Sequence, residues 1–166
     1  TFWLGPIADV SRQREMGLYA MLVVEEREPL AGLFQVPLIL DDWKLDDEGR
    51  IDDDFDDLEE AIAQGRLGNW FTVNGGYRPR MEVPRDRIAR LRMLNTANVR
   101  TIGVQFKGAD PLVAALDGNP VKLRNVGTGP LLLAPGQRAD QRGHRGYVSA
   151  HRRRQPKPGI CRARLE

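Results

Sequence analysis

The residues best suited to chemistry in this chain are one cysteine and two histidines, and all three lie near the C-terminus. Cys161 could supply a thiolate nucleophile or metal ligand, and His144 and His151 could supply imidazole bases or ligands. The histidines lie in a glycine- and arginine-rich segment without regular pattern, and Cys161 is flanked by Ile160 and Arg162 rather than by histidine. We therefore interpret all three as incidental. No Ser/His/Asp arrangement, phosphate-binding glycine loop or zinc-ligand spacing occurs elsewhere, and a single cysteine excludes an intrachain disulfide.

Carboxylates are the other candidates, as the pair Asp41 and Asp42 and as the acid-rich stretch that follows them. Adjacent residues of a strand point to opposite faces, so we predict a turn role at a strand end for this pair rather than acid–base catalysis. The acid-rich stretch fails the EF-hand calcium pattern. Placing the turn glycine at Gly49 puts Lys44 at the first ligand position and Phe55 where a bidentate acid belongs.

The acid-rich stretch instead predicts a helix over about residues 53–64. Phe55, Leu58 and Ile62 share one face, and aspartates crowd the first turn, where the helix dipole favours negative charge. Gly65 can end this helix. The stretch is therefore read as a solvated, dipole-stabilised helix start.

The rest of the chain up to about residue 140 is predicted to consist mainly of strands. Residues 18–26 form a near-continuous apolar run, which predicts a strand buried on both faces. A second strand is predicted over 36–43, with Pro37 tolerable only near its start or at a sheet edge. From residue 69 onward, short alternating segments recur about every ten residues, separated by the turns Asn74-Gly75-Gly76 and Asp117-Gly118-Asn119-Pro120. The alternating apolar positions include Ala89, Leu91, Met93, Ile102, Val104 and Phe106. This pattern predicts an antiparallel sandwich or barrel.

The charge distribution divides the chain in two. Residues 141–166 hold eight Lys and Arg against one acid, about +7, which leaves 17 basic and 22 acidic residues, about −5, in residues 1–140. The C-terminal segment lacks a period of two, so we predict no regular structure there. Its Arg152, Arg153, Arg154 and Lys157 could bind nucleic acid or another anionic surface, with Tyr147 as the only stacking aromatic. We favour an out-of-frame or degenerate end over such a binding tail.

Several segments together resemble a bacterial multicopper oxidase of the laccase-like kind, in order and in spacing. They are GLYAMLVVEE, VPLILDDWKLDDEGRID, NWFTVNGGYRPRMEV, RLRMLNTANVR, PLVAALDGNPV and LLLAPGQRAD. The resemblance covers about residues 1–140, from the end of that family's first cupredoxin domain through most of its second. It implies an all-β, cupredoxin-like (plastocyanin-like) Greek-key β-sandwich with one short helix. It also implies copper-dependent oxidation of a substrate coupled to dioxygen reduction, with copper as the cofactor of the intact family.

The copper ligands that the resemblance implies are absent from their expected place. The family's first domain ends in Phe-Trp-Tyr-His-Pro-His, and aligning Phe2, Trp3 and Pro6 puts the two ligand histidines at Gly5 and Ile7. Neither side chain offers a lone pair. The resemblance therefore implies no catalytic, cofactor-binding or metal-binding residue within this chain.

The sequence thus predicts three parts: residues 1–30 as a C-terminal remnant of a preceding cupredoxin domain, 36–140 as a cupredoxin-like domain, and 141–166 as a disordered or out-of-frame basic tail. We expect a fragment or degenerate member of the oxidase family, inactive as this isolated chain, that supplies a structural, copper-free domain. The alternative is a non-catalytic binding module that uses the Arg-rich tail. Expected partners are the other cupredoxin domains of a full-length oxidase, with neither membrane nor nucleic acid, and the resemblance implies a periplasmic or exported location whose signal lies outside these residues. If the tail cannot close the sheet, an unpaired edge should promote aggregation.

Overall fold

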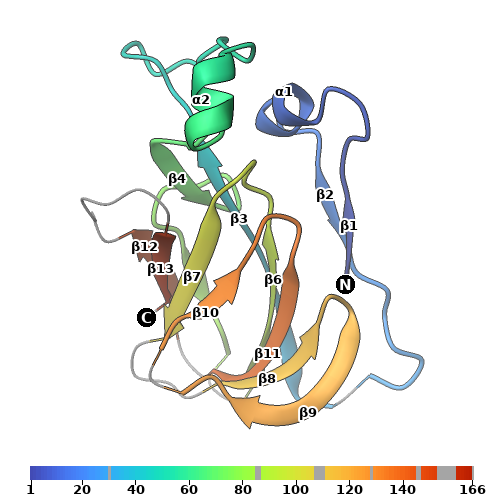
Figure 1. The fold of residues 1–166 in the computed structure, drawn as a ribbon. Coiled ribbons are helices and arrows are strands. Elements are labelled where there is room, and N and C mark those ends of the chain that lie inside the picture. Colours follow the sequence, from blue (N-terminus) through green and yellow to red (C-terminus); the bar gives the residue numbers. More distant parts are fainter. Residues whose placement is uncertain are drawn as a thin grey trace.

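A computed structural model provides the fold of residues 1–29, 31–84, 87–106, 111–127, 129–144, 147–152 and 160–165. In chain order its elements are β1 Phe2–Leu4, α1 Val10–Glu15, β2 Ala20–Leu22, β3 Leu33–Trp43, α2 Leu58–Ala63, β4 Trp70–Val73, β5 Arg80–Glu82, β6 Ile88–Asn95, β7 Thr101–Phe106, β8 Leu112–Leu116, β9 Asn119–Asn125, β10 Leu131–Leu133, β11 Arg138–His144, β12 Tyr147–Arg152 and β13 Ile160–Leu165. One sheet has the strand order β4-β3-β6-β11-β8-β9 and a second has β10-β7-β13-β12-β5 (Figure 1). The expected all-β sandwich is confirmed, but its sheets are mixed rather than purely antiparallel, because β3 pairs in parallel with β6 and β13 pairs in parallel with β7.

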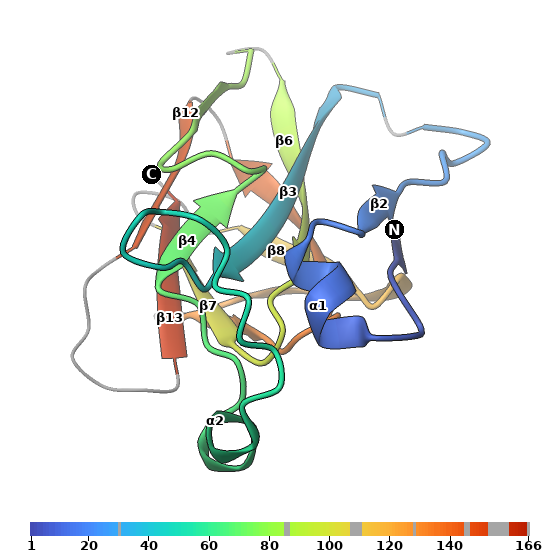
Figure 2. The same ribbon diagram turned by 90° about the horizontal axis from the view of Figure 1, so that it is seen from above.

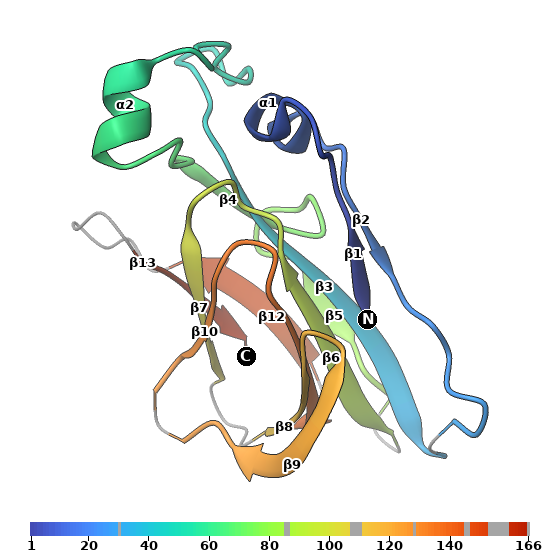
Figure 3. The ribbon, with the colours of Figure 1, turned by 45° about the vertical axis from the view of Figure 1, so that its right-hand side comes forward.

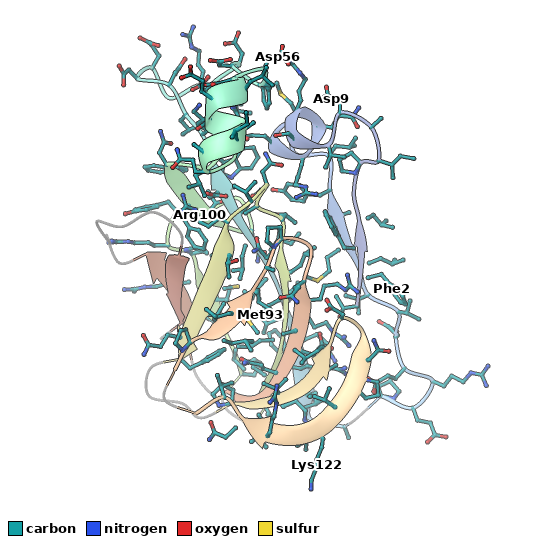
Figure 4. The ribbon with its side chains drawn as sticks, viewed as in Figure 1. Phe2, Asp9, Asp56, Met93, Arg100 and Lys122 are labelled. Atoms are coloured by element: carbon teal, nitrogen blue, oxygen red, sulfur yellow. The ribbon has the colours of Figure 1, made fainter. Side chains whose placement is uncertain are left out.

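The core lies between these two sheets, and the predicted period of two builds it. On β6, Ala89, Leu91 and Met93 are almost completely buried, and on β7 so are Ile102 and Val104. Side chains of both strands join one apolar cluster, and Met93 lies inside the body of the molecule (Figure 4). The alternation predicted from the sequence is therefore confirmed for both strands, because successive strand side chains face opposite ways.

Two tight turns lie where the sequence predicted them. Asp117-Gly118 joins the paired strands β8 and β9, whereas Asn74-Gly75 is closed only by the bridge between Val73 and Gly76, because β4 and β5 belong to different sheets. Asn74 and Gly75 have φ angles of 50° and 72°, and Asp117 and Gly118 have 49° and 84°. Positive φ at both central positions is the geometry that matches the right-handed twist of paired strands. Asn74 also donates a hydrogen bond from its side chain to the Pro37 carbonyl at 2.9 Å. β4 pairs with β3 only from Leu40 to Trp43, so Pro37 has the edge position that was predicted for it.

The apolar run at residues 18–26 differs from its prediction. Only β2 is a strand there, and Leu22 and Val24 are 46% and 59% exposed. β2 pairs with β1 in a two-stranded ribbon. This ribbon lies along one side of β3 and forms no part of either large sheet (Figure 3). A strand buried on both faces needs layers on both sides, and the described residues supply none on the outer side of this ribbon.

The predicted helix is present but shorter, and its apolar face is open. α2 begins after the N-cap Asp57, whose side chain accepts a hydrogen bond from the Glu60 amide. Leu58 and Ile62 are 74% and 86% exposed, so the shared apolar face does not pack on the sheet as an amphipathic helix would. Neither helix among the described residues is long and apolar enough to cross a membrane.

The described part of the C-terminal segment also differs from its prediction. β12 pairs antiparallel with β5 and β13, and β13 pairs in parallel with β7. These strands form although the sequence shows no alternation of apolar and polar residues. The hydrogen bonds between paired strands join backbone N–H and C=O groups, which every residue type except proline carries in full. β13 lies beside β7, so the unpaired edge expected there is filled, and the argument for aggregation loses its basis. The out-of-frame interpretation stays a prediction from the sequence.

Candidate functional site

The two expected copper-ligand positions lie at the surface. Gly5 follows β1 and is exposed, and Ile7 is 99% exposed. Gly5 borders a hollow of about 340 Å³ whose other lining residues are Leu4, Gly17, Leu18, Tyr19 and Ala20. Copper in this kind of site needs imidazole nitrogen or thiolate sulfur, and none of these side chains carries either. The residues present therefore do not fit copper at this place.

Trp3 occupies the space beside Gly5 and fixes the ribbon to the sheet. A Cβ atom added to Gly5 would lie 2.9 Å from the Trp3 ring, and one added to Gly136 would lie 2.5 Å from it. The Arg14 guanidinium covers the same indole, 4.7 Å from the ring centroid. Glycine at both positions lets the backbone approach the ring closely. The Phe-Trp element of the sequence thus has a packing role here.

This slot gives a first prediction. Gly136→Ala should destabilise the chain by about 1–3 kcal/mol more than Gly127→Ala, because only the first substitution drives a methyl group into Trp3. Both glycines have positive φ, 78° and 80°, so both variants carry the same backbone strain, and nothing lies within 4 Å of the Gly127 position. Urea unfolding followed by tryptophan fluorescence measures the difference. Equal losses would contradict the role assigned to Trp3.

The histidines and the cysteine fall on three different strands. His144 ends β11 opposite Ala89, His151 pairs with Arg164, and Cys161 pairs with Ile102. Within the described ranges, no group of three or more His, Cys, Asp or Glu residues could hold a metal ion. The structure thus does not bring the three candidate residues together as one site.

The most tightly built polar centre joins α1 to the loops around α2. Glu15 is 4% exposed and Arg66 is 7% exposed, and the Arg66 Nε donates to a Glu15 carboxylate oxygen at 2.5 Å. Glu15 also accepts from the Lys44 amide at 2.6 Å and from the Asn98 side chain at 3.0 Å. The remaining Arg66 nitrogens donate to the carbonyls of Asp52 and Asp54. Both buried charges are fully partnered, as burial in a low-dielectric interior requires.

Phe55 contacts two guanidinium groups in the same region. Arg66 lies 3.9 Å and Arg12 lies 4.6 Å from the centroid of its ring. Contact of a cation with an aromatic ring is favourable and orders the side chains involved. Phe55 was predicted to share a helix face with Leu58, but the structure uses it to attach the acid-rich loop to α1.

Asp41 and Asp42 are buried within the sheet, so the predicted turn role is wrong for both. Their carboxylates face opposite sides, as the alternation of a strand requires. Asp42 binds the Arg100 Nε at 2.5 Å and the Gly68 amide at 2.7 Å. Asp41 instead makes hydrogen bonds with Tyr19 and Thr96, and burial raises its pKa to about 7. The same burial, followed by the charge of Asp41, raises the pKa of Tyr19.

A fourth buried carboxylate, that of Asp140, joins the ribbon to the sheet. Asp140 on β11 accepts from Arg92 at 2.7 Å and from Arg90 at 2.9 Å. Arg90 extends to Glu26 after β2, and Arg92 donates to the hydroxyl of Thr1. The first residues of the chain are therefore held to the sheet by charged groups as well as by Trp3. Sequence reasoning did not anticipate the arginine partners of Glu15, Asp42 and Asp140, because those arginines lie 48 to 58 residues away along the chain.

Comparison with known protein families found no matching family profile. Among curated proteins, the cell division protein FtsP of Xenorhabdus nematophila is 32% identical over 131 residues, and that of Yersinia pestis is 30% identical over the same length. These alignments cover 75% of this chain, and the chain spans only 26% of the relatives' length.

Solved structures give a second comparison. The multi-copper oxidase of Pseudomonas thermotolerans superposes with a TM-score of 0.81 and 30% identity, over 99% of this chain and 40% of that one. The multi-copper oxidase of Pseudomonas parafulva gives a TM-score of 0.78 and 33% identity, over 87% of this chain and 35% of that one.

Proposed function

We propose that this chain, which is multicopper oxidase-like in sequence and a cupredoxin-like β-sandwich in fold, serves as a copper-free structural domain and not as a catalytic one. In this proposal residues 1–30 are the end of a preceding cupredoxin domain, and residues 36–140 are the structural domain. The proposed task is to hold neighbouring cupredoxin domains in place within a longer polypeptide. The 26% to 40% of its relatives' length that the chain spans supports this arrangement.

One observation carries the proposal: glycine and isoleucine stand where the resemblance places two copper-binding histidines. In the intact family, copper supplies electron transfer from a substrate to dioxygen. Gly5 and Ile7 cannot bind it, and Trp3 fills the space into which a side chain at Gly5 would extend. Trp3, which packs against both Gly5 and Gly136, attaches this segment to the loop before β11.

The names of the relatives do not decide between catalysis and structure. The curated relatives are named for cell division, and the solved structures are named as oxidases. Identity is about the same to both groups, 30% to 33%. The proposal therefore rests on the residues at the two ligand positions.

Metal analysis tests the proposal directly. After reconstitution with cuprous and cupric salts and removal of loose metal, we expect less than one copper per chain and no intense blue absorption band. An intact multicopper oxidase treated in parallel is the positive control. Tightly bound copper at one or more per chain, or an intense blue band, would overturn the proposal, because a strong band of this kind requires a copper–thiolate bond.

The alternative function, a binding module that uses the Arg-rich C-terminal tail, rests only on the positive charge of that tail. Residues 141–166 carry about +7, but Arg153, Arg154 and Lys157 lie outside the described residues. β12 and β13 pair with β5 and β7, so removal of the segment would also remove two strands from a sheet. This alternative therefore remains a prediction from the sequence.

A further inference from the structure

The open face of α2 is the least expected feature of the surface. Leu58 and Ile62 lie one helical turn apart on the same face, 74% and 86% exposed, and no residue of the helix is buried. An isolated helix of this length is unstable in water, and helices in folded proteins usually gain their stability by packing an apolar face. α2 instead projects away from both sheets (Figure 2).

Contacts beneath α2 nevertheless hold it in a defined position. The Asp57 side chain caps its first turn, and the Lys44 ammonium lies 2.7 Å from the Glu60 carboxylate and 3.3 Å from that of Asp52. Phe55, just before the helix, contacts the guanidinium groups of Arg12 and Arg66. The chain thus holds α2 through polar and aromatic contacts on its inner side while its apolar pair faces outward.

The surroundings of this apolar pair are strongly acidic. Residues 46–60 contain ten Asp and Glu and a single base, Arg50. Asp53, Asp56 and Glu59, all within five residues of Leu58 in the sequence, are exposed, and Asp56 lies at the outer end of the molecule (Figure 4). Such a field repels nucleic acid and anionic lipid, and it attracts cationic groups over several ångströms. A complementary ligand must combine positive charge with apolar side chains.

We propose that the α2 face, defined by Leu58 and Ile62 with the carboxylates of Asp53, Asp56 and Glu59, docks a basic amphipathic segment of a protein partner. The two aliphatic side chains supply apolar anchors, and the acidic rim steers a Lys- or Arg-rich segment onto them. This inference goes beyond the structural role proposed above and does not depend on whether copper binds.

Binding of a defined probe to the whole chain tests the docking face. The probe is a dye-labelled helical peptide of lysine and leucine with its leucines on one face, and fluorescence anisotropy reports its affinity. A scrambled peptide of the same composition and an analogue with glutamate in place of lysine are the reference probes. We expect measurable binding of the amphipathic lysine peptide alone, weakened by added salt.

The variant L58S/I62S should weaken this binding about tenfold or more, because it removes both apolar anchors and leaves every charge in place. L123S/L132S is the matched control, since Leu123 and Leu132 are 48% and 50% exposed on strands away from α2, and it should bind like the wild-type chain. Melting curves of both variants check that the fold is retained.

Two results would overturn the proposal. One is equal affinity of the wild-type chain and L58S/I62S, or of the ordered and scrambled peptides, which would reduce the effect to charge alone. The other is salt-sensitive self-association of the chain by sedimentation that L58S/I62S abolishes, which would make the occupant a second copy.

Discussion

At about pH 8, Asp41→Asn is expected to be more stable than the wild-type chain, whereas at about pH 4 the two should differ little. The free energy of unfolding, obtained from urea titrations across this pH range, measures the effect. The variant should lose the decrease in stability that the wild-type chain shows as the pH rises between these limits.

The expectation follows from the surroundings of Asp41. Asp41 is only 4% exposed, and this burial is the main cause that raises the pKa of its carboxyl group from 3.8 to about 7. Hydrogen bonds from Tyr19 oppose this shift, and the nearby charge of Asp42 adds to it. The carboxyl group is therefore easier to keep protonated in the folded chain than in the unfolded one.

The sign and size can be worked out from these values. Below pH 3.8 the group is protonated in both states and imposes no cost. As the pH rises toward 7 the unfolded chain ionises while the folded chain retains the proton, so stability falls, and above 7 the cost stays constant. A shift of this size corresponds to about 4 kcal/mol. An asparagine cannot ionise, so the variant should gain up to about this amount at high pH.

Asp46→Asn is the control for this experiment. The Arg50 amide and side chain lower the pKa of the Asp46 carboxyl, so its ionisation changes stability only at acidic pH. This control should keep the decrease between about pH 4 and pH 7. A matching decrease in Asp41→Asn would show that another group controls the pH dependence.

Arg66→Met is expected to destabilise the chain by about 3–5 kcal/mol, because it leaves the Glu15 carboxylate buried without a positive partner. The Arg66 and Glu15 side chains are 6% and 2% exposed. The loss also removes the donors to the carbonyls of Asp52 and Asp54 and the cation–π contact with Phe55. Thermal and urea unfolding measure the change.

Two further variants separate the buried charge from general loss of an arginine. Arg50→Met removes a guanidinium that is 74% exposed and pairs with Asp46 at 3.0 Å, and it should cost no more than about 1 kcal/mol. Adding Glu15→Gln to Arg66→Met should recover part of the loss, because the remaining group is then uncharged. A loss of the same size for Arg50→Met, or a further loss in the double variant, would contradict this account.

Local patterns predicted those parts of the fold that depend on neighbouring residues. The alternation on β6 and β7 indicated which side chains enter the core, and Asn74-Gly75 and Asp117-Gly118 indicated where the chain makes tight turns. These predictions succeed because the two-residue period of a strand and the positive φ of a tight turn are properties of a few consecutive residues.

The candidate site was only partly open to such reasoning. The residue types at positions 5 and 7 argued against copper without any coordinates. The exposure of Leu58 and Ile62 could not be anticipated, because periodicity shows that two side chains share a face but not whether another element covers that face. β12 and β13 could not be predicted for a related reason. They pair through backbone groups, and their sequences show no alternation of apolar and polar residues that would indicate a strand.

Neighbouring residues were enough to predict the strand pattern, the tight turns and the lack of metal-binding side chains at the two expected copper-ligand positions. The pairing of Glu15 with Arg66, the pairing of Asp42 with Arg100 and the burial of Asp41 could be seen only in the folded chain. The physical reason is that the energy of a charge depends on its burial and on its partners. Those partners come from strands and loops far apart in the chain, and they meet only when the two sheets, the ribbon and α1 have packed together.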